Sequence, residues 1–204
     1  FWALKGIDLE VAPASLTILK GRSGSGKTTL INILGALDAP TEGSVFYSDT
    51  DITTLSGVER DRLRRGEIGF MFQSIALVSM MSAYENVEFG LRVAGYSRSE
   101  YKERVTECLQ LVGLSQRAKH MPQELSGGEQ QRVAIARAIA HKPRVVFADE
   151  PTAELDSNTA HHVAQIFREL VEREKMTVVL STHDMSLLDI ADKVYELQDG
   201  KIVG

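Results

Sequence analysis

The sequence predicts an α/β fold with a mainly parallel sheet covered by helices on both faces. Four short apolar runs, rich in β-branched or aromatic residues and bounded by polar or turn residues, resemble buried parallel strands. They are Leu16–Lys20, Glu67–Phe72, Arg144–Asp149 and Thr177–Thr182. Helical patterns lie between them, and the clearest places Val163, Ile166, Phe167, Leu170 and Val171 on one helix face. Strands that alternate with helices favour a sheet between two helical layers.

The composition fits a single globular domain of 204 residues, 43% hydrophobic and 25% charged. A formal charge of -5 argues against a general basic surface, so we expect no nucleic-acid partner. One cysteine, Cys108, excludes an internal disulfide framework and lies on an apolar helix face, where we expect it in the core. No apolar run approaches the ~20 residues that span a bilayer.

The first strand leads into a motif for binding phosphate. The run "GRSGSGKTT" matches G-x-x-x-x-G-K-[ST] and precedes an apolar helical run, Leu30 to Leu37, which is the context that the motif requires. Its backbone N–H groups converge on phosphate oxygens, Lys27 reaches the terminal phosphates, and Thr28 offers a hydroxyl to Mg2+. The predicted nucleotide-binding residues here are Gly21, Arg22, Ser23, Gly24, Ser25, Gly26, Lys27, Thr28 and Thr29. A Gly/Ser loop that only turns the chain is the alternative.

The middle of the chain is predicted to be helical. Ser82 to Ala140 shows helical periodicity on both sides of the turn-prone "AGYS" and contains no convincing strand. We expect residues 75–140 to form a helical subdomain inserted between residues 1–74 and 141–204, the two parts of the catalytic core. Near the end, Asp199-Gly200 between apolar runs predicts a hairpin.

An acidic pair follows the third strand, in "VVFADEP". Asp149 ends a buried strand, where a carboxylate needs a cation or hydrogen bonds, and it is expected to hold Mg2+ through water. Glu150 is the candidate to orient and polarise an attacking water molecule. The alternatives are a helix cap or a surface salt bridge.

A second segment that could hold an anion is "LSGGEQQR", Leu125–Arg132. Ser126 can cap a helix beginning near Gly128, and successive N–H groups there form an anion seat reinforced by the helix dipole. Taken alone, the segment is equally well explained as an N-cap.

The full set of motifs resembles the ATP-binding cassette (ABC) ATPases, the nucleotide-binding subunits of ABC transporters. The set is "GRSGSGKTT", Gln73 in "MFQ", "LSGGEQQR", "VVFADEP", "AELD" and His183 in "STHD", in that order. The resemblance implies a P-loop NTPase (RecA-like) core, a small antiparallel β subdomain, and ATP with Mg2+ as cofactors. It also implies a head-to-tail homodimer or pseudo-dimer, in which each ATP lies between the phosphate loop of one subunit and the "LSGGEQ" segment of the other.

The resemblance assigns further roles. Gln73 would contact Mg2+ and the attacking water, and His183 would contact the γ-phosphate. Asp156 would belong to a loop that communicates across the dimer. The residues that would approach the other subunit's ATP are Ser126, Gly127, Gly128 and Gln130. Without the resemblance, Gln73 would be interpreted as a surface residue and His183 as a capping or buried histidine. Asp156 and the segment that begins at Ser126 would be interpreted as helix caps.

Within the family, "ENVEFGLRVAG" and "LSGGEQQRVAIARA" look most like the ATPases of lipoprotein-release, macrolide-export and antimicrobial-peptide-resistance systems, with the cell-division ABC ATPase close by. We therefore expect transmembrane permease subunits as partners, contacted through Ser74 to Glu88, and a peripheral location on the cytoplasmic face of the inner membrane. The alternatives are a soluble ABC ATPase acting on DNA or ribosomes, and a regulatory role.

The sequence departs from the family pattern at several places. The aromatic residue that stacks on adenine should precede "ALKG"; Phe1 and Trp2 are aromatic but stand too close to that stretch. "SIALVSMM" lacks a common proline. Lys20, Ala153 and Glu154 replace other usual residues. We expect the chain to be truncated at both ends.

Overall fold

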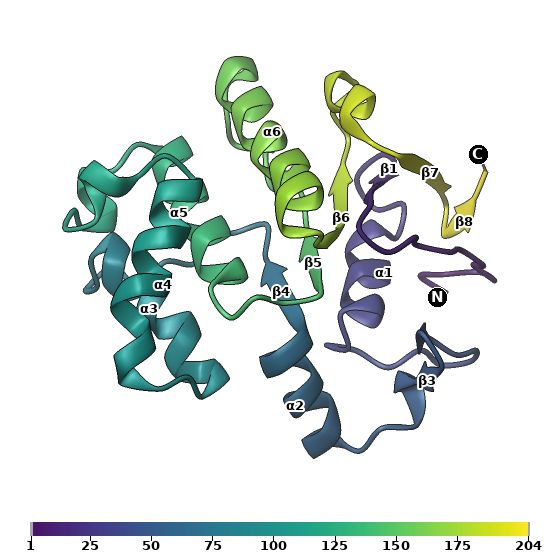
Figure 1. Ribbon diagram of the computed structural model, residues 1–204. Coiled ribbons are helices and arrows are strands. Elements are labelled where there is room, and N and C mark those ends of the chain that lie inside the picture. The colour runs from purple at the N-terminus through teal and green to yellow at the C-terminus, as the bar shows by residue number, and fades with distance from the viewer. Residues whose placement is uncertain (1, 204) are drawn as a thin grey trace.

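The computed structural model describes residues 2–203, and a six-stranded sheet forms its centre (Figure 1). The strands are β4 (Ile68–Met71), β5 (Val145–Ala148), β6 (Thr177–Thr182), β1 (Leu16–Lys20), β7 (Lys193–Gln198) and β8 (Lys201–Ile202), in that spatial order. All neighbouring pairs are parallel except β7 and β8. The four strands predicted from the sequence are therefore β1, β4, β5 and β6.

Alternation along the strands divides the core into two layers, because successive side chains in a strand point to opposite faces. Ile18, Val146 and Val178 belong to a cluster that also contains apolar residues of the helical middle of the chain. Leu19 and Phe147 belong to a second cluster on the other face, which contains residues of the helix after the phosphate motif. The expected arrangement of helices on both faces of the sheet is confirmed.

Six α-helices accompany the sheet, and serine or aspartate precedes most of them. The helices are α1 (Lys27–Leu34), α2 (Gly57–Glu67), α3 (Ala83–Ala94), α4 (Arg98–Leu111), α5 (Gly127–Ile139) and α6 (Ser157–Glu174). Ser56, Ser82 and Ser126 begin helices with reciprocal capping boxes, each pairing with a glutamate three residues later. Short 3-10 turns are η1 (Ile52–Thr54), η2 (Ser115–Arg117), η3 (Pro122–Glu124) and η4 (Met185–Ile190).

Two antiparallel pairs complete the fold. β2 (Phe46–Tyr47) and β3 (Thr50–Asp51) form a small separate sheet. Among residues 2–203, this two-stranded sheet corresponds to the expected small antiparallel β subdomain. β7 and β8 form the hairpin predicted from Asp199-Gly200, and both turn residues have positive φ, 49° and 79°. The backbone N–H of Gly200 donates to Ser25 O at 3.0 Å, so this turn supports the phosphate loop.

The helical middle of the chain shares its core with the sheet. Val87 of α3, Leu109 of α4 and Ile135 of α5 are fully or almost fully buried in the same cluster as β1 and β5 residues. At Gly69 of β4, an added Cβ would lie 2.5 Å from Ala138 O, which shows how closely the end of α5 approaches the sheet. The α-helices between residues 75 and 140 thus pack directly against one face of the sheet.

Some details differ from the sequence expectations. α1 ends at Leu34, before Leu37, because the chain turns at Gly35. Met80, in the segment Ser74 to Glu88 that we expect to contact a partner, is 85% exposed. Cys108 is fully buried, as expected, and burial raises the pKa of its thiol to about 11. Among residues 2–203, no helix combines the length and apolar character needed to cross a bilayer.

Candidate active site

The phosphate loop connects β1 to α1 by a backbone that only glycine adopts easily. Gly24 and Gly26 have φ of 80° and 106°, in the region that disfavours residues with a Cβ. Ser25 between them is buried, and its Oγ has no hydrogen-bond partner within residues 2–203. Such an unsatisfied buried hydroxyl fits a loop built to donate to an anion.

Lys27 is the first residue of α1 and is 5% exposed. Its Nζ donates to Gly21 O at 2.8 Å and to Arg22 O at 3.2 Å, and lies 3.0 Å from Glu150 Oε1. A buried ammonium is costly unless acceptors surround it. The loop and β5 therefore meet at this side chain, although they come from distant parts of the sequence.

Glu150 follows β5 in a left-handed conformation, with φ of 48°. Its second oxygen, Oε2, lies 2.7 Å from His183 Nδ1, just beyond β6. A residue other than glycine in this region stores strain that the surrounding contacts must offset. The predicted catalytic candidates Glu150 and His183 are thus in direct contact, with Lys27 on the other side of the carboxylate.

Ser181 of β6, which the sequence analysis did not single out, organises the acidic pair. Its hydroxyl donates to Asp149 Oδ1 at 2.6 Å and accepts from the backbone N–H of Glu150 at 2.9 Å. Asp149 is 4% exposed and Ser181 is fully buried. The signal in the sequence was a polar residue at a buried position of an apolar strand.

The remaining residues predicted around this centre lie at its edges. Gln73 is exposed, two residues beyond the end of β4, and Met71 O accepts from the N–H of Asp149 at 2.9 Å. Thr28 is exposed on the first turn of α1. Trp2 is 57% exposed, and the next residue, Ala3, lies against Gly26, so the start of the described chain borders the loop. Phe1 lies outside the described residues.

The second predicted segment begins α5. Ser126 is exposed and caps the helix, which starts at Gly127, and Gln130 Nε2 donates to Pro122 O and Leu125 O at 3.0 and 3.1 Å. Within residues 2–203, no hydrogen bond or ion pair joins the segment Leu125–Arg132 to the loop Gly21–Thr29. In Figure 1, α5 lies with α3 and α4 on the left, and α1 lies beside β1 and β6.

Asp156 caps α6, and in the part of the chain from residue 2 to residue 203 no hydrogen bond or ion pair joins it to Lys27 or Glu150. Its carboxylate accepts from the N–H groups of Asn158 and Thr159, and the Thr159 hydroxyl donates to Oδ2 at 2.6 Å. The hydrogen bonds from Thr159 lower the pKa of this carboxyl below its usual value.

The donor set around the loop suits a metal that is shared with a phosphate. No group of three or more His, Cys, Asp or Glu side chains that could hold a metal ion by itself occurs between residues 2 and 203. Mg2+ in phosphoryl-transfer sites is held by one or two carboxylates together with substrate phosphates and water. Thr28 and Asp149 beside a phosphate loop fit that pattern.

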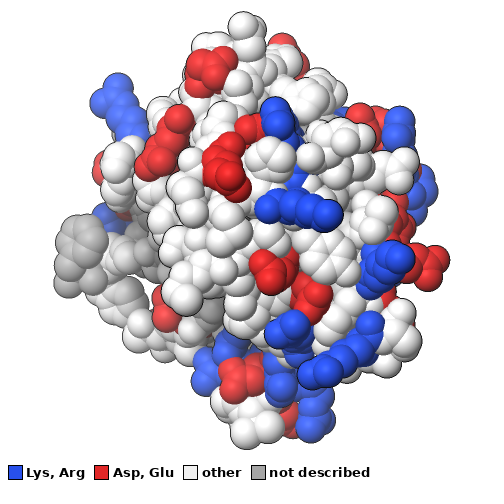
Figure 2. Space-filling view, turned by 90° about the vertical axis from the view of Figure 1, so that its left-hand side faces the viewer, with Lys and Arg blue, Asp and Glu red and all other residues white. Residues whose placement is uncertain are grey.

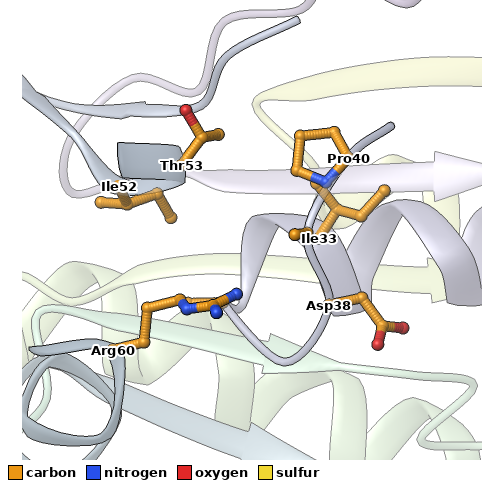
Figure 3. A pocket seen from close by; sticks show the side chains of 8 residues that line it. Ile33, Asp38, Pro40, Ile52, Thr53 and Arg60 are labelled. Atoms are coloured by element: carbon orange, nitrogen blue, oxygen red, sulfur yellow. The ribbon is translucent and has the colours of Figure 1, made fainter. Parts of the chain in front are cut away.

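A small cavity and the distribution of surface charge can be compared with the loop as places that a ligand could occupy. A cavity of about 10 Å3 between Ile33, Pro40, Ile52 and Arg60 holds at most about one water molecule (Figure 3). On the face in Figure 2, basic and acidic side chains are interspersed over broad uncharged areas. That face offers no continuous basic surface for a nucleic acid.

Comparisons with known proteins agree on one family. A family model described as "ABC transporter" matches residues 4–153. An uncharacterized ABC transporter ATP-binding protein of Mycobacterium bovis is 46% identical over 199 residues, 98% of this chain and 60% of that relative. The lipoprotein-releasing system ATP-binding protein LolD of Nitrobacter hamburgensis is 45% identical over 200 residues, 98% of this chain and 86% of LolD.

A solved structure has the same fold. It is a dimeric structure of a post-hydrolysis state of the ATP-binding cassette MJ0796 bound to ADP and Pi, with a TM-score of 0.90 and 40% identity. The match covers 99% of this chain and 89% of that one. By contrast, the chain spans less than two thirds of the length of the mycobacterial relative.

Proposed function

The chain belongs to the ABC transporter family, as the order of its motifs indicates, and from that premise we propose that it is an ATP-hydrolysing subunit. It binds ATP with Mg2+ at the interface of a head-to-tail dimer and drives a transmembrane partner. The observation that carries the proposal is the contact of Lys27 with Glu150. This contact brings a phosphate-binding lysine, a candidate base and His183 into one site.

The phosphate loop has the features of a triphosphate site. ATP gives Lys27 phosphate oxygens as acceptors, and the Ser25 hydroxyl and the loop N–H groups can donate to the same oxygens. Thr28 and Asp149 would hold Mg2+, which neutralises charge on the phosphates. Ser181 fixes the Asp149 carboxylate for that role.

Gln73, Glu150 and His183, which follow β4, β5 and β6, have different roles in the proposed hydrolysis. The Glu150 carboxylate accepts a proton as a water oxygen bonds to the γ-phosphorus. The bond from that phosphorus to the bridging oxygen breaks, and its electron pair leaves with ADP. His183 positions Glu150 and the γ-phosphate, and Gln73 positions the water.

The start of α5 serves the nucleotide of a second subunit in this proposal. Gly127 is exposed, its φ is not positive, and an added Cβ would meet nothing within 4 Å. Alanine is the better helix former, so neither conformation nor packing within the described chain explains this glycine. The close approach of a group from outside the chain does explain it.

The membrane partner docks on a groove of about 530 Å3 between α2, β4, α3 and α5, which we name the α2–α3 groove. Its lining includes Phe70, Val93 and Arg137. Arg137 donates to Ala76 O at 2.8 Å and so links the groove to the predicted partner segment from Ser74 to Glu88. Phe72, Phe89 and Val93 are 41 to 48% exposed, an apolar surface that such a partner would cover. The proposed location is therefore peripheral, on the cytoplasmic face of the inner membrane.

Ser126→Arg tests the shared site. A long cation at this exposed position blocks the neighbour's nucleotide, so we expect ATP hydrolysis by the full-length protein to fall to background. A single subunit should retain its nucleotide affinity. Hydrolysis and equilibrium binding of a labelled ATP analogue measure the two effects.

Ser56→Arg is the matched control, because Ser56 caps α2 through the same capping box. It should cost about 0.5–2 kcal/mol of stability and leave hydrolysis in place. Normal hydrolysis by Ser126→Arg, or loss of nucleotide binding by its single subunit, would refute the shared site.

A further inference from the structure

Gly128 at the start of α5 lies directly against Thr159 of α6. A Cβ added to Gly128 would stand 2.3 Å from Thr159 Cγ2, far inside a van der Waals contact. Gly128 is buried and its φ is not positive, so the backbone itself would accept other residues. The reason for glycine within this chain is therefore the methyl group of Thr159.

Hydrogen bonds hold that methyl group in place. Thr159 Oγ1 donates to Asp156 Oδ2 at 2.6 Å, and its backbone N–H donates to Asp156 Oδ1 at 3.1 Å. Rotation about χ1 would move the methyl group away from Gly128 but would break the hydroxyl bond to Asp156. One half-buried side chain thus connects the cap of α6 with the first turn of α5.

We propose that Thr159 is a positioning residue that holds the segment Ser126–Gly128 and the Asp156 loop as one unit. The methyl group sets the spacing between the two helix starts, and the hydroxyl fixes Asp156. The inference rests on the proposed function, in which Ser126–Gly128 faces the nucleotide of a second subunit, and on the expected role of the Asp156 loop in communication across the dimer. Thr159 acts on turnover by the dimer and not on nucleotide binding by a single subunit.

The methyl contact is tested by a double-substitution cycle in the full-length protein. Gly128→Ala should lower kcat for ATP hydrolysis roughly 100-fold, because a displacement of about 1 Å can cost that much. Thr159→Ser removes Cγ2 and leaves the nearest atoms of residue 159, Cβ and Oγ1, at 3.7 and 3.9 Å from the new Cβ. Gly128→Ala combined with Thr159→Ser should therefore recover kcat to within about threefold of Thr159→Ser alone.

The hydroxyl is tested by Thr159→Val, which keeps the methyl group and removes the bond to Asp156. We expect kcat to fall roughly tenfold while nucleotide affinity of the single subunit stays unchanged. Thr106→Val is the matched control, since Thr106 Oγ1 donates to Lys102 O at 2.7 Å on the exposed side of α4. This control should hydrolyse ATP at the unchanged rate.

The outcomes separate this inference from the proposed function. A double variant as inactive as Gly128→Ala, or a Thr159→Val variant with normal kcat, would overturn the positioning role even if Ser126→Arg abolishes hydrolysis. Active Ser126→Arg would instead remove the shared site itself. Thermal unfolding midpoints identify any variant that does not fold; if Gly128→Ala is such a variant, the comparison of Thr159→Val with Thr106→Val decides.

Discussion

Glu150 shows how three neighbours define the chemistry of one residue. The carboxylate has Lys27 Nζ at 3.0 Å from one oxygen and His183 Nδ1 at 2.7 Å from the other, and the backbone N–H is held by Ser181. The left-handed φ of 48° is strained for glutamate, and such strain persists only where contacts over-determine it. A water-activating carboxylate needs this fixed orientation.

Glu150→Gln should keep the size of the side chain and remove its ability to take a proton. We expect hydrolysis to fall on the order of 10²- to 10⁴-fold, the usual worth of a general base, while ATP stays bound and a closed dimer accumulates. Phosphate release and size-exclusion chromatography with ATP measure the two effects. Glu103→Gln, on the exposed side of α4, controls for the loss of one charge. Unchanged hydrolysis by Glu150→Gln would remove Glu150 from its proposed role.

At the scale of elements, four strands of the central sheet were predictable because each is a short apolar run. The predicted Leu16–Lys20 and Thr177–Thr182 have the same bounds as β1 and β6. The charged run Glu59–Arg65 lies in α2, which buries none of its residues.

Strand order was not predictable, because pairing depends on contacts between residues far apart in the sequence. β1, first in the chain, lies between β6 and β7.

An ion-pair network anchors β1 to the segment before β7. Asp192 Oδ2 accepts from the backbone N–H of Leu16 at 2.8 Å, and Arg168 Nη1 lies 2.8 and 2.9 Å from its two oxygens. The bond from Leu16, followed by that from Arg168, lowers the pKa of the Asp192 carboxyl below its usual value. The folded structure therefore stabilises the ionised form of the Asp192 carboxyl.

The pKa of Asp192 gives the pH dependence a definite sign. Because it is lower in the folded than in the unfolded chain, the stabilisation is fully present above the unfolded pKa of about 4 and is lost as the pH falls through the folded value. Asp192→Asn should lower the free energy of unfolding at pH 7 by on the order of 1 kcal/mol, since the carboxylate is 41% exposed and screened.

Denaturant unfolding between pH 7 and pH 3 measures this difference, which should shrink below about pH 4. Asp189→Asn, on the neighbouring η4, is the exposed control. A difference between Asp192→Asn and the unaltered protein that stays constant down to pH 3 would contradict the electrostatic origin.

At the scale of the whole molecule, the helical region and the sheet share one core. The exposed apolar residues Phe89 and Val93 lie one turn apart on α3, and Val93 lines the α2–α3 groove. Force applied to α3 by a docked partner would reach the start of α5 through packed side chains. This continuity suits a subunit that couples hydrolysis to movement of a partner.

Val93→Glu should disrupt docking, because it places a charged group, which is costly to remove from water, where the partner would cover an exposed apolar side chain. We expect the integral membrane partner to be lost when the full-length protein is purified from membranes. Val203→Glu, at another exposed valine, is the matched control and should retain it. Undiminished recovery of the membrane protein with Val93→Glu would move the docking surface elsewhere, and recovery of ribosomes or DNA in its place would favour a soluble ABC ATPase.

The sequence by itself determined the residues of both predicted phosphate-binding segments, the acidic pair and most helices and strands. These depend on residue identity and on periodicity along a few neighbouring positions, which a single chain displays directly. Lys27, Asp149 and Ser126 could be named for this reason.

Only the tertiary structure decided how these pieces meet. Four features join residues that are far apart in the sequence. They are the Ser181 bridge, the pairing of Lys27 with Glu150, the fit of Thr159 against Gly128 and the α2–α3 groove. Close packing sets those distances, and no local pattern encodes which distant side chains will share a contact.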